Sequence, residues 1–129
     1  MEREGWLSGL IDAEGCFIVT LSKDKIGQRF VLSQKDAKEE MDEISDMIRG
    51  YGETGKGEMD RVVVNYSKAE KLMRYLEDNE LRSVKGISFR RWKEIYDIRK
   101  RGERKERLEE IKKKSKMINN LRKLEENEL

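Results

Sequence analysis

A short apolar segment, residues 6–17, constrains the fold more than any other part of this 129-residue chain. It reads WLSGLIDAEGCF, a helix-forming run with several small residues that ends in an acid followed by Gly15. At about 100° per residue, one stripe of this helix suits a protein core and consists of Leu7, Leu10 and Ile11. Gly9 and Ala13 lie on the opposite side and lack bulk. We therefore expect the helix to pack on its own domain and against a second helix, and to end at Gly15.

The carboxylate at the end of this helix suggests a metal site. Glu14 lies where the helix macrodipole is negative, so its charge is disfavoured there unless a cation is present. If two copies of the helix cross at their small residues, two Glu14 carboxylates approach and repel each other. A divalent cation resolves this conflict, and oxygen ligands suit Mg²⁺, with phosphate groups completing its shell. Asp12 lies about 200° around the helix from Glu14, so we expect it to form helix-end hydrogen bonds at the interface.

Residues 7–15, LSGLIDAEG, resemble the nonapeptide that names the LAGLIDADG homing endonucleases. The departures are Ser8 for alanine and Glu14 for the second aspartate. Both are familiar variants of the motif, and Glu14 keeps a carboxylate at the metal position. Three flanking residues are also typical of the family: Trp6, Cys16 and Phe17. The resemblance implies a site-specific endonuclease that hydrolyses phosphodiester bonds of double-stranded DNA with Mg²⁺, for which Mn²⁺ can substitute.

Composition limits the classes of function open to the chain. The sequence has no histidine, which excludes His-based zinc sites, catalytic triads and His-dependent nuclease motifs. The net charge is only +2, but residues 99–116 contain ten Lys or Arg against four Glu. No run is long and apolar enough to span a membrane, and no signal-peptide pattern is present. The single cysteine, Cys16, suits a reducing compartment. We therefore expect an intracellular protein of a bacterial or archaeal cytoplasm or of an organelle.

Hydrophobic periodicity predicts helices and strands in the order αββαββα, followed by a helical extension. After the first helix we expect strands over 16–23 and 28–34, a helix over 37–49, a short strand among the glycines of 50–57, a strand over 61–66, a helix to about 79, and a helix over 87–101. Asp36 and Ser67 are the predicted N-caps of two helices. The inward face of the first strand is predicted to carry Phe17, Val19 and Leu21.

The family's core unit has this same order, with two hairpins that form a curved four-stranded antiparallel sheet backed by helices. The resemblance therefore implies an α+β fold, with residues 1–101 as the core domain and 102–129 as a charged helical extension packed on it. Segment 31–36 is similar to the family's strand end with its recurrent glutamine, and segment 81–86 to the segment with its recurrent lysine. In all, the similarity covers most of residues 5–122. The implied catalytic residues are Glu14, Gln34 and Lys85, with metal ligands at Glu14 and Gly15.

The polar face of the predicted sheet is the expected DNA-binding surface. Its varied donors and acceptors suit readout of base edges in the major groove, whereas binding of phosphates alone needs mainly Lys and Arg. A hairpin strand of about seven residues spans roughly 23 Å, so two subunits match a site of about two duplex turns. The candidate DNA-binding residues are Thr20, Ser22, Lys23, Lys25, Arg29, Ser33, Lys35, Lys56, Arg61 and Asn65. The candidate dimer-interface residues are Leu7, Ser8, Gly9, Asp12 and Ala13.

A single nonapeptide without an internal repeat resembles the single-motif branch of the family, which forms homodimers. The expected partners are therefore double-stranded DNA and a second copy of the chain, without a membrane or a small-molecule cofactor. Two alternatives remain open at this point. One is a non-cleaving nucleic-acid binder, such as an intron RNA maturase or a DNA-binding regulator, and the other is half of a heterodimer with an asymmetric target. The presence of Glu14, Gln34 and Lys85 together favours cleavage over binding alone.

Overall fold

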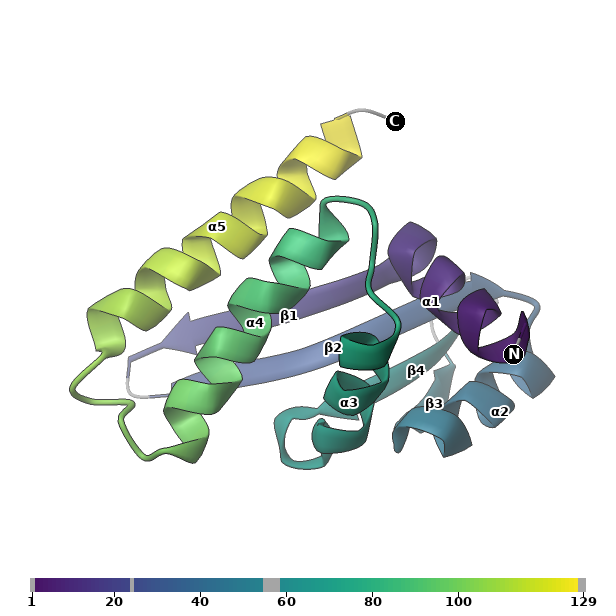
Figure 1. The fold of residues 1–129 in the computed structure, drawn as a ribbon, viewed down its shortest axis with the longest axis horizontal. Helices are drawn as coiled ribbons and strands as arrows, with labels where there is room; N and C mark the ends of the chain where they lie inside the picture. The colour runs from purple at the N-terminus through teal and green to yellow at the C-terminus, as the bar shows by residue number, and fades with distance from the viewer. Residues whose placement is uncertain (1, 24, 55–58, 128–129) are drawn as a thin grey trace.

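The computed structural model describes residues 2–23, 25–54 and 59–127 and has an α+β fold. Its helices are α1 (Glu2–Glu14), α2 (Lys38–Ile48), α3 (Glu70–Asp78), α4 (Lys85–Lys100) and α5 (Leu108–Asn127). Its strands are β1 (Gly15–Ser22), β2 (Lys25–Lys35), β3 (Tyr51–Thr54) and β4 (Met59–Asn65), and the 3₁₀ turn η2 (Tyr66–Lys68) follows β4. The predicted order of elements, including the helical extension, is confirmed (Figure 1).

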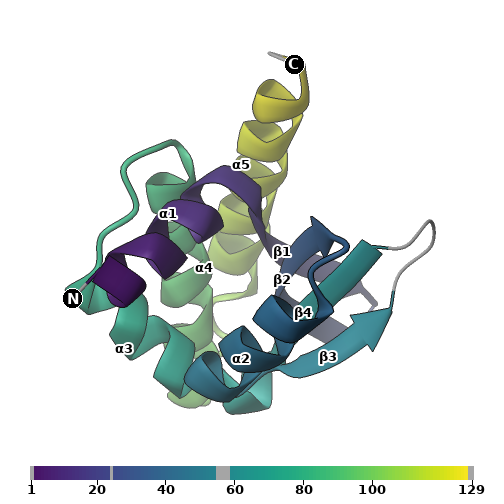
Figure 2. The ribbon, with the colours of Figure 1, turned by 90° about the vertical axis from the view of Figure 1, so that its right-hand side faces the viewer.

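The strands form a single antiparallel sheet in the order β1-β2-β4-β3. On β2, Phe30 and Leu32 point toward the core and are fully buried. Phe30 lies opposite Val64 of β4, and Leu32 lies opposite Val62. The helices α1 to α4 cover this face, while α5 runs along α4 and the edge strand β1 (Figures 1 and 2). The opposite face of the sheet is left without a covering helix among the described residues.

Phe17 of β1 is the centre of a buried aromatic cluster. Its ring centroid lies 5.0 Å from that of Phe30, 5.5 Å from Phe89 and 5.7 Å from Trp92. The Trp92 indole N–H also donates a hydrogen bond of 3.3 Å to the carbonyl of Ile18. Aromatic pairs of this kind contribute about 0.5–1.5 kcal/mol beyond the burial of their area. The cluster therefore fixes α4 firmly against β1 and β2.

Both predicted helix caps are wrong. Asp36 lies outside the cap position, with a left-handed φ of 51°, and the N-cap of α2 is Ala37. The Ala37 N–H instead donates to the carboxylate of Asp60 on β4 at 3.2 Å. Ser67 lies within the 3₁₀ turn, and the N-cap of α3 is Ala69. In both cases the chain turns before the helix begins, which moves the expected capping side chain out of reach.

Two details near the ends of elements were not expected. Leu21 shares the face of β1 with Phe17 and Val19, as predicted, but it is 38% exposed because it lies next to the hairpin end of the strand, where it pairs with Ile26. Helix α4 begins at Lys85 rather than at Ile87, so Gly86 lies inside the helix and does not separate it from the preceding loop. The first turn of α4 thereby includes Lys85 itself.

The charged extension forms helix α5, which is packed on the core. Ile111 and Ile118 are fully buried and belong to the same hydrophobic cluster as the sheet, whereas Leu124 is 51% exposed. The division of the chain into a core domain and an extension at residue 101 stays a prediction. None of the described helices combines the length and apolar character that crossing a membrane requires.

Candidate active site

The first helix passes directly into the first strand, because α1 ends at Glu14 and β1 begins at Gly15. Position 15 has no room for a side chain. A Cβ atom at position 15 would lie 2.7 Å from the carbonyl oxygen of Ile11 and 2.9 Å from the ring of Phe30. Such close approach of the backbone is a common reason for glycine in a strand. The prediction that the helix ends at Gly15 is confirmed, and this contact holds Glu14 at the border of the core.

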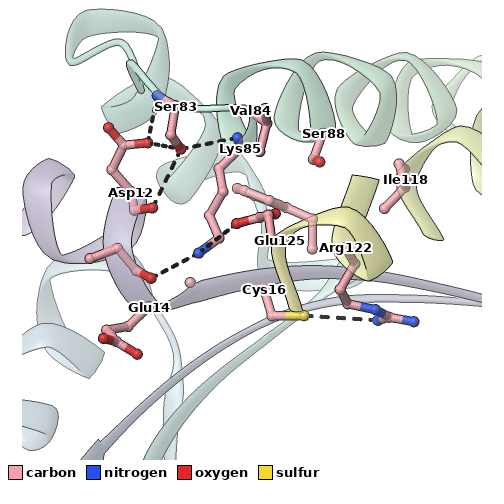
Figure 3. A pocket seen from close by; sticks show the side chains of 13 residues that line it. Asp12, Glu14, Cys16, Ser83, Val84, Lys85, Ser88, Ile118, Arg122 and Glu125 are labelled. Carbon is pink, nitrogen blue, oxygen red and sulfur yellow. Dashed lines mark hydrogen bonds and ion pairs between the residues drawn. The ribbon is translucent and has the colours of Figure 1, made fainter. Parts of the chain in front are cut away.

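A cavity of about 710 Å³ lies beside this junction (Figure 3). It is bounded by the end of α1, by residues 83–88 at the start of α4, and by the C-terminal half of α5. Three segments that are far apart in the sequence therefore meet at one place. The ionisable side chains that line the cavity are Asp12, Glu14, Cys16, Lys85, Arg122 and Glu125.

Asp12 connects the end of α1 to the loop before α4 through hydrogen bonds. Its carboxylate accepts hydrogen bonds from the backbone N–H of Arg82 at 2.9 Å and of Ser83 at 3.0 Å, and also from the Ser83 hydroxyl. Burial by itself raises the pKa of Asp12, but the bonds from Ser83 and Arg82 and the charge of Lys85 outweigh it and lower that pKa below the usual value. The helix-end bonds expected of Asp12 therefore form within the chain, and its place in an interface stays a prediction.

Lys85 is held by two acceptors from distant parts of the chain. Its Nζ donates to the carbonyl oxygen of Ala13 at 3.0 Å, at the end of α1, where the helix dipole favours a cation. Nζ also forms an ion pair of 3.3 Å with the Glu125 carboxylate of α5 (Figure 3). The Lys85 side chain is only 12% exposed. The structure thus brings the predicted lysine to the end of the helix that carries Glu14.

Glu14 lines the same cavity and is exposed. Its carboxylate is turned away from Lys85 (Figure 3). Over the described ranges, no cluster of three or more Asp, Glu, Cys or His side chains is arranged to hold a metal ion. Of the three carboxylates that line the cavity, Asp12 and Glu125 are bound to groups of the same chain, and Glu14 is exposed.

Gln34 lies at the same end of the sheet but not in the cavity. Gly15, the first residue of β1, pairs with Leu32 of β2. Gln34 lies two residues further along β2, beyond the end of β1, and pairs with Asp60 of β4. It is partly buried, and in the described part of the chain it is absent from the residues that line the cavity. Its assignment to the site stays a prediction.

The uncovered face of the sheet carries the predicted DNA-binding side chains in adjacent rows. Arg29 pairs with Ile18 on one side and with Asn65 on the other, and Ser33 pairs with Arg61. Thr20, Ser22, Lys25 and Lys35 share this face by alternation, and Lys23 lies in the hairpin turn. Lys56 lies outside the described residues.

An apolar row crosses the middle of this face. Val31 pairs with Cys16 on β1 and with Val63 on β4, and Val63 pairs with Tyr51 on β3. Val63 is 1% exposed, although it lies on the face opposite the core, whereas Tyr51 is 47% exposed. The face therefore combines polar rows with apolar contact area.

One face of α1 remains uncovered in the single chain. Gly9 and Ala13 are exposed, Ser8 is partly exposed, and Trp6 is 43% exposed. A Cβ atom at Gly9 would meet no atom within 4 Å. Leu7, in contrast, is fully buried, so it serves the core of its own chain rather than this uncovered surface. The expectation of a helix with small residues on a free face agrees with these exposures.

Sequence reasoning missed Arg122 and Glu125. Arg122 donates to the Sγ of Cys16 at 3.8 Å, and Glu125 pairs with Lys85. A usable signal exists, because Arg122 and Glu125 lie four and seven residues beyond Ile118, on the stripe of α5 that faces the core. Charged side chains at core-facing positions of a helix are expected to bind polar or oppositely charged groups there, because burial of an unpaired charge is costly.

Comparison with known proteins gives a consistent result. The family model described as LAGLIDADG endonuclease matches residues 7–96. The probable intron-encoded endonuclease 4 of Neurospora crassa is 31% identical over 100 residues, which is 72% of this chain. The chain spans 18% of the length of that relative.

Solved structures share the fold at low sequence identity. The homing endonuclease I-TnaI matches with a TM-score of 0.80 and 22% identity, over 87% of this chain and 84% of its own. The archaeal intron-encoded homing endonuclease I-Vdi141I, solved in complex with DNA, matches with a TM-score of 0.82 and 23% identity, over 92% and 83%. The LAGLIDADG homing endonuclease I-GzeII, in complex with its DNA target, has a TM-score of 0.82 and 18% identity, over 89% of this chain and 43% of its own. The predicted four-stranded α+β architecture is thereby confirmed.

Proposed function

The chain belongs to the LAGLIDADG endonuclease family, and from this premise we propose that it is a homodimeric, Mg²⁺-dependent endonuclease specific for a long, near-palindromic double-stranded DNA site. One observation carries the proposal. The uncovered small-residue face of α1 ends at Glu14, beside a cavity that also holds Lys85. Two chains that pack through this face bring both Glu14 carboxylates together at the centre of the dimer.

The donor set fits Mg²⁺. Glu14 offers exposed carboxylate oxygens, the backbone at Gly15 adds a carbonyl oxygen, and DNA phosphates supply further oxygen ligands, which is the chemistry that Mg²⁺ prefers. When bound, the metal polarises the scissile phosphate and lowers the pKa of the attacking water. Mn²⁺ is expected to substitute because it accepts the same ligands.

The residues of the chain itself bind and orient the DNA. The Lys85 ammonium has three N–H donors, of which one is bound to the Ala13 carbonyl, while Glu125 forms an ion pair with the same group. A further N–H group of this ammonium is proposed to bind a phosphate oxygen, where it stabilises the charge that develops during cleavage. Gln34 is proposed to orient water at the edge of the site, by resemblance to the family.

The uncovered sheet face is the proposed DNA-binding surface. Polar side chains such as Arg29 and Asn65 provide hydrogen bonds to base edges, and Val31 provides apolar contact to thymine methyl groups. Lysines at the strand ends, including Lys25 and Lys35, are suited to phosphate contacts that fix the register of the duplex.

Selection of cleaved plasmids from a random-site library in the presence of Mg²⁺ tests the proposal. We expect a consensus site whose halves are related by two-fold symmetry. The Glu14→Gln variant should recover no cleaved sites. The control variant Glu39→Gln, which changes an exposed glutamate of α2, should recover the same consensus as wild type. An asymmetric consensus would identify half of a heterodimer. Binding of DNA or intron RNA without any cleavage would instead support the maturase or regulator alternative.

A further inference from the structure

The last turns of α5 meet the candidate active site. Glu125 lies 40 residues after Lys85 in the sequence, yet its Oε2 atom is 3.3 Å from the Lys85 Nζ. The two side chains are 27% and 12% exposed, so solvent screens this pair less than it screens most of the ion pairs on α5. Arg122, one turn earlier, contacts Cys16 at the start of β1.

We propose that Glu125 is a positioning residue, which holds the Lys85 ammonium beside the end of α1 so that it meets the scissile phosphate. This inference rests on the proposed function. Lysine has a long side chain with four rotatable bonds, and a single contact to the Ala13 carbonyl leaves the position of Nζ poorly defined. A second acceptor on the opposite side, supplied by Glu125, restricts Nζ to one place (Figure 3).

The remaining contacts of the site explain why Glu125 itself is held in place. The contact of Arg122 with Cys16 fixes this part of α5 against β1. On the other side, the Lys85 backbone N–H donates to the Ser83 hydroxyl at 3.1 Å, and that hydroxyl is bonded to Asp12. The backbone and the ammonium of Lys85 are therefore fixed by separate groups, and Glu125 acts on the ammonium.

The test uses the full-length protein and the DNA site recovered by the library selection. Glu125→Ala should lower the single-turnover cleavage rate on the order of tenfold, as is typical when a group that orients an active-site side chain is removed. The Kd for DNA should stay within about twofold, because Glu125 is paired with Lys85 and an ionised carboxylate has no donor for a phosphate. Glu125→Gln retains an oxygen acceptor without the charge and should be intermediate. The matched control is Glu109→Ala, an exposed glutamate of the same helix that pairs with Lys112.

A double-mutant cycle separates positioning from a general effect on the fold. In a Lys85→Ala background, Glu125→Ala should cause no further loss of cleavage rate. An equal loss with and without Lys85 would overturn the proposal, as would an unchanged rate in Glu125→Ala alone. Either result leaves the proposed function intact if the wild-type protein cleaves and Glu14→Gln does not.

A second measurement does not depend on the DNA target. Hydrogen-bonded ammonium protons exchange slowly with water, so the Lys85 Nζ signal should be visible by ¹H–¹⁵N NMR in the wild-type protein and in Glu109→Ala. It should broaden or vanish in Glu125→Ala. A Lys85 signal that is the same in all three proteins would show that Glu125 does not hold the ammonium.

Discussion

Substitution of Gly9 should have opposite effects on the single chain and on the dimer. Gly9 lies inside α1, is exposed, and has open space where a Cβ atom would stand. Glycine in a helix interior costs about 0.5–1 kcal/mol relative to alanine. Gly9→Ala should therefore raise the free energy of unfolding of the isolated chain by this amount, which is a rise in Tm of roughly 2–4 °C for a domain of this size. Gly9→Leu should also stabilise the isolated chain, by slightly less than Gly9→Ala does.

The same substitution should weaken a dimer that packs through α1. Forcing extra methylene groups into a close-packed contact costs about 1–3 kcal/mol. Two-fold symmetry places residue 9 of both chains at the contact, so Gly9→Leu should cost the dimer about 2–6 kcal/mol. This corresponds to a rise in Kd from about 30-fold to about 10⁴-fold.

Two assays separate these effects. Sedimentation velocity over a range of concentrations gives the dimer Kd, and urea unfolding at a dilution where the proteins are monomeric gives the stability of the chain. Trp6 is 43% exposed and Trp92 is fully buried, so dimer formation should also shift tryptophan emission to the blue through Trp6. Lys113→Leu, at an exposed position of α5, controls for added surface hydrophobicity. A Gly9→Leu protein with an unchanged dimer Kd would refute close packing through α1, and a less stable monomer would refute the open space at Gly9.

Three other substitutions test the interior of the chain. Asp12→Asn should lower the free energy of unfolding by about 1–2 kcal/mol at neutral pH. The pKa of Asp12 is lowered in the folded state. The difference in unfolding free energy between wild type and variant should therefore be complete above the usual carboxyl pKa near 4, and it should disappear as the pH falls through the folded-state pKa. Urea unfolding at a series of pH values measures this difference. Gln28→Leu removes one buried and one partly buried hydrogen bond between β2 and α4 and should lower the free energy of unfolding in urea by about 1–2 kcal/mol. Gly15→Ala should lower the free energy of unfolding by about 1–3 kcal/mol through overpacking, and the Tm should fall with it. Gly5→Ala should not lower the Tm, because a Cβ atom at Gly5 would lie in open space.

Elements with strong periodicity were predictable from the sequence. The alternation of β1 places Phe17 and Val19 in the core, and the spacing in α2 places Met41, Ile44 and Ile48 there, as the burial of all five confirms. These patterns involve neighbours within a few residues, so local sequence contains enough information. The ends of elements depend on competing partners instead. Asp60 binds the N–H group of Ala37 in place of a local cap, and no pattern near residue 37 indicates this.

The site was predictable only in its local part. The motif identifies Glu14 and Gly15 because they are adjacent in one helix–strand junction, and the resemblance identifies Lys85. The groups that hold Lys85 come from Ala13, 72 residues away, and from Glu125, at the far end of α5. The contact with Glu125 arises from the packing of α5 on β1 and α4, and the contact with Ala13 joins the start of α4 to the end of α1; local sequence encodes neither. Because the heptad spacing from Ile118 leads directly to Glu125, a charged residue that continues a buried stripe is the sequence feature that best locates a long-range polar contact in a chain of this kind.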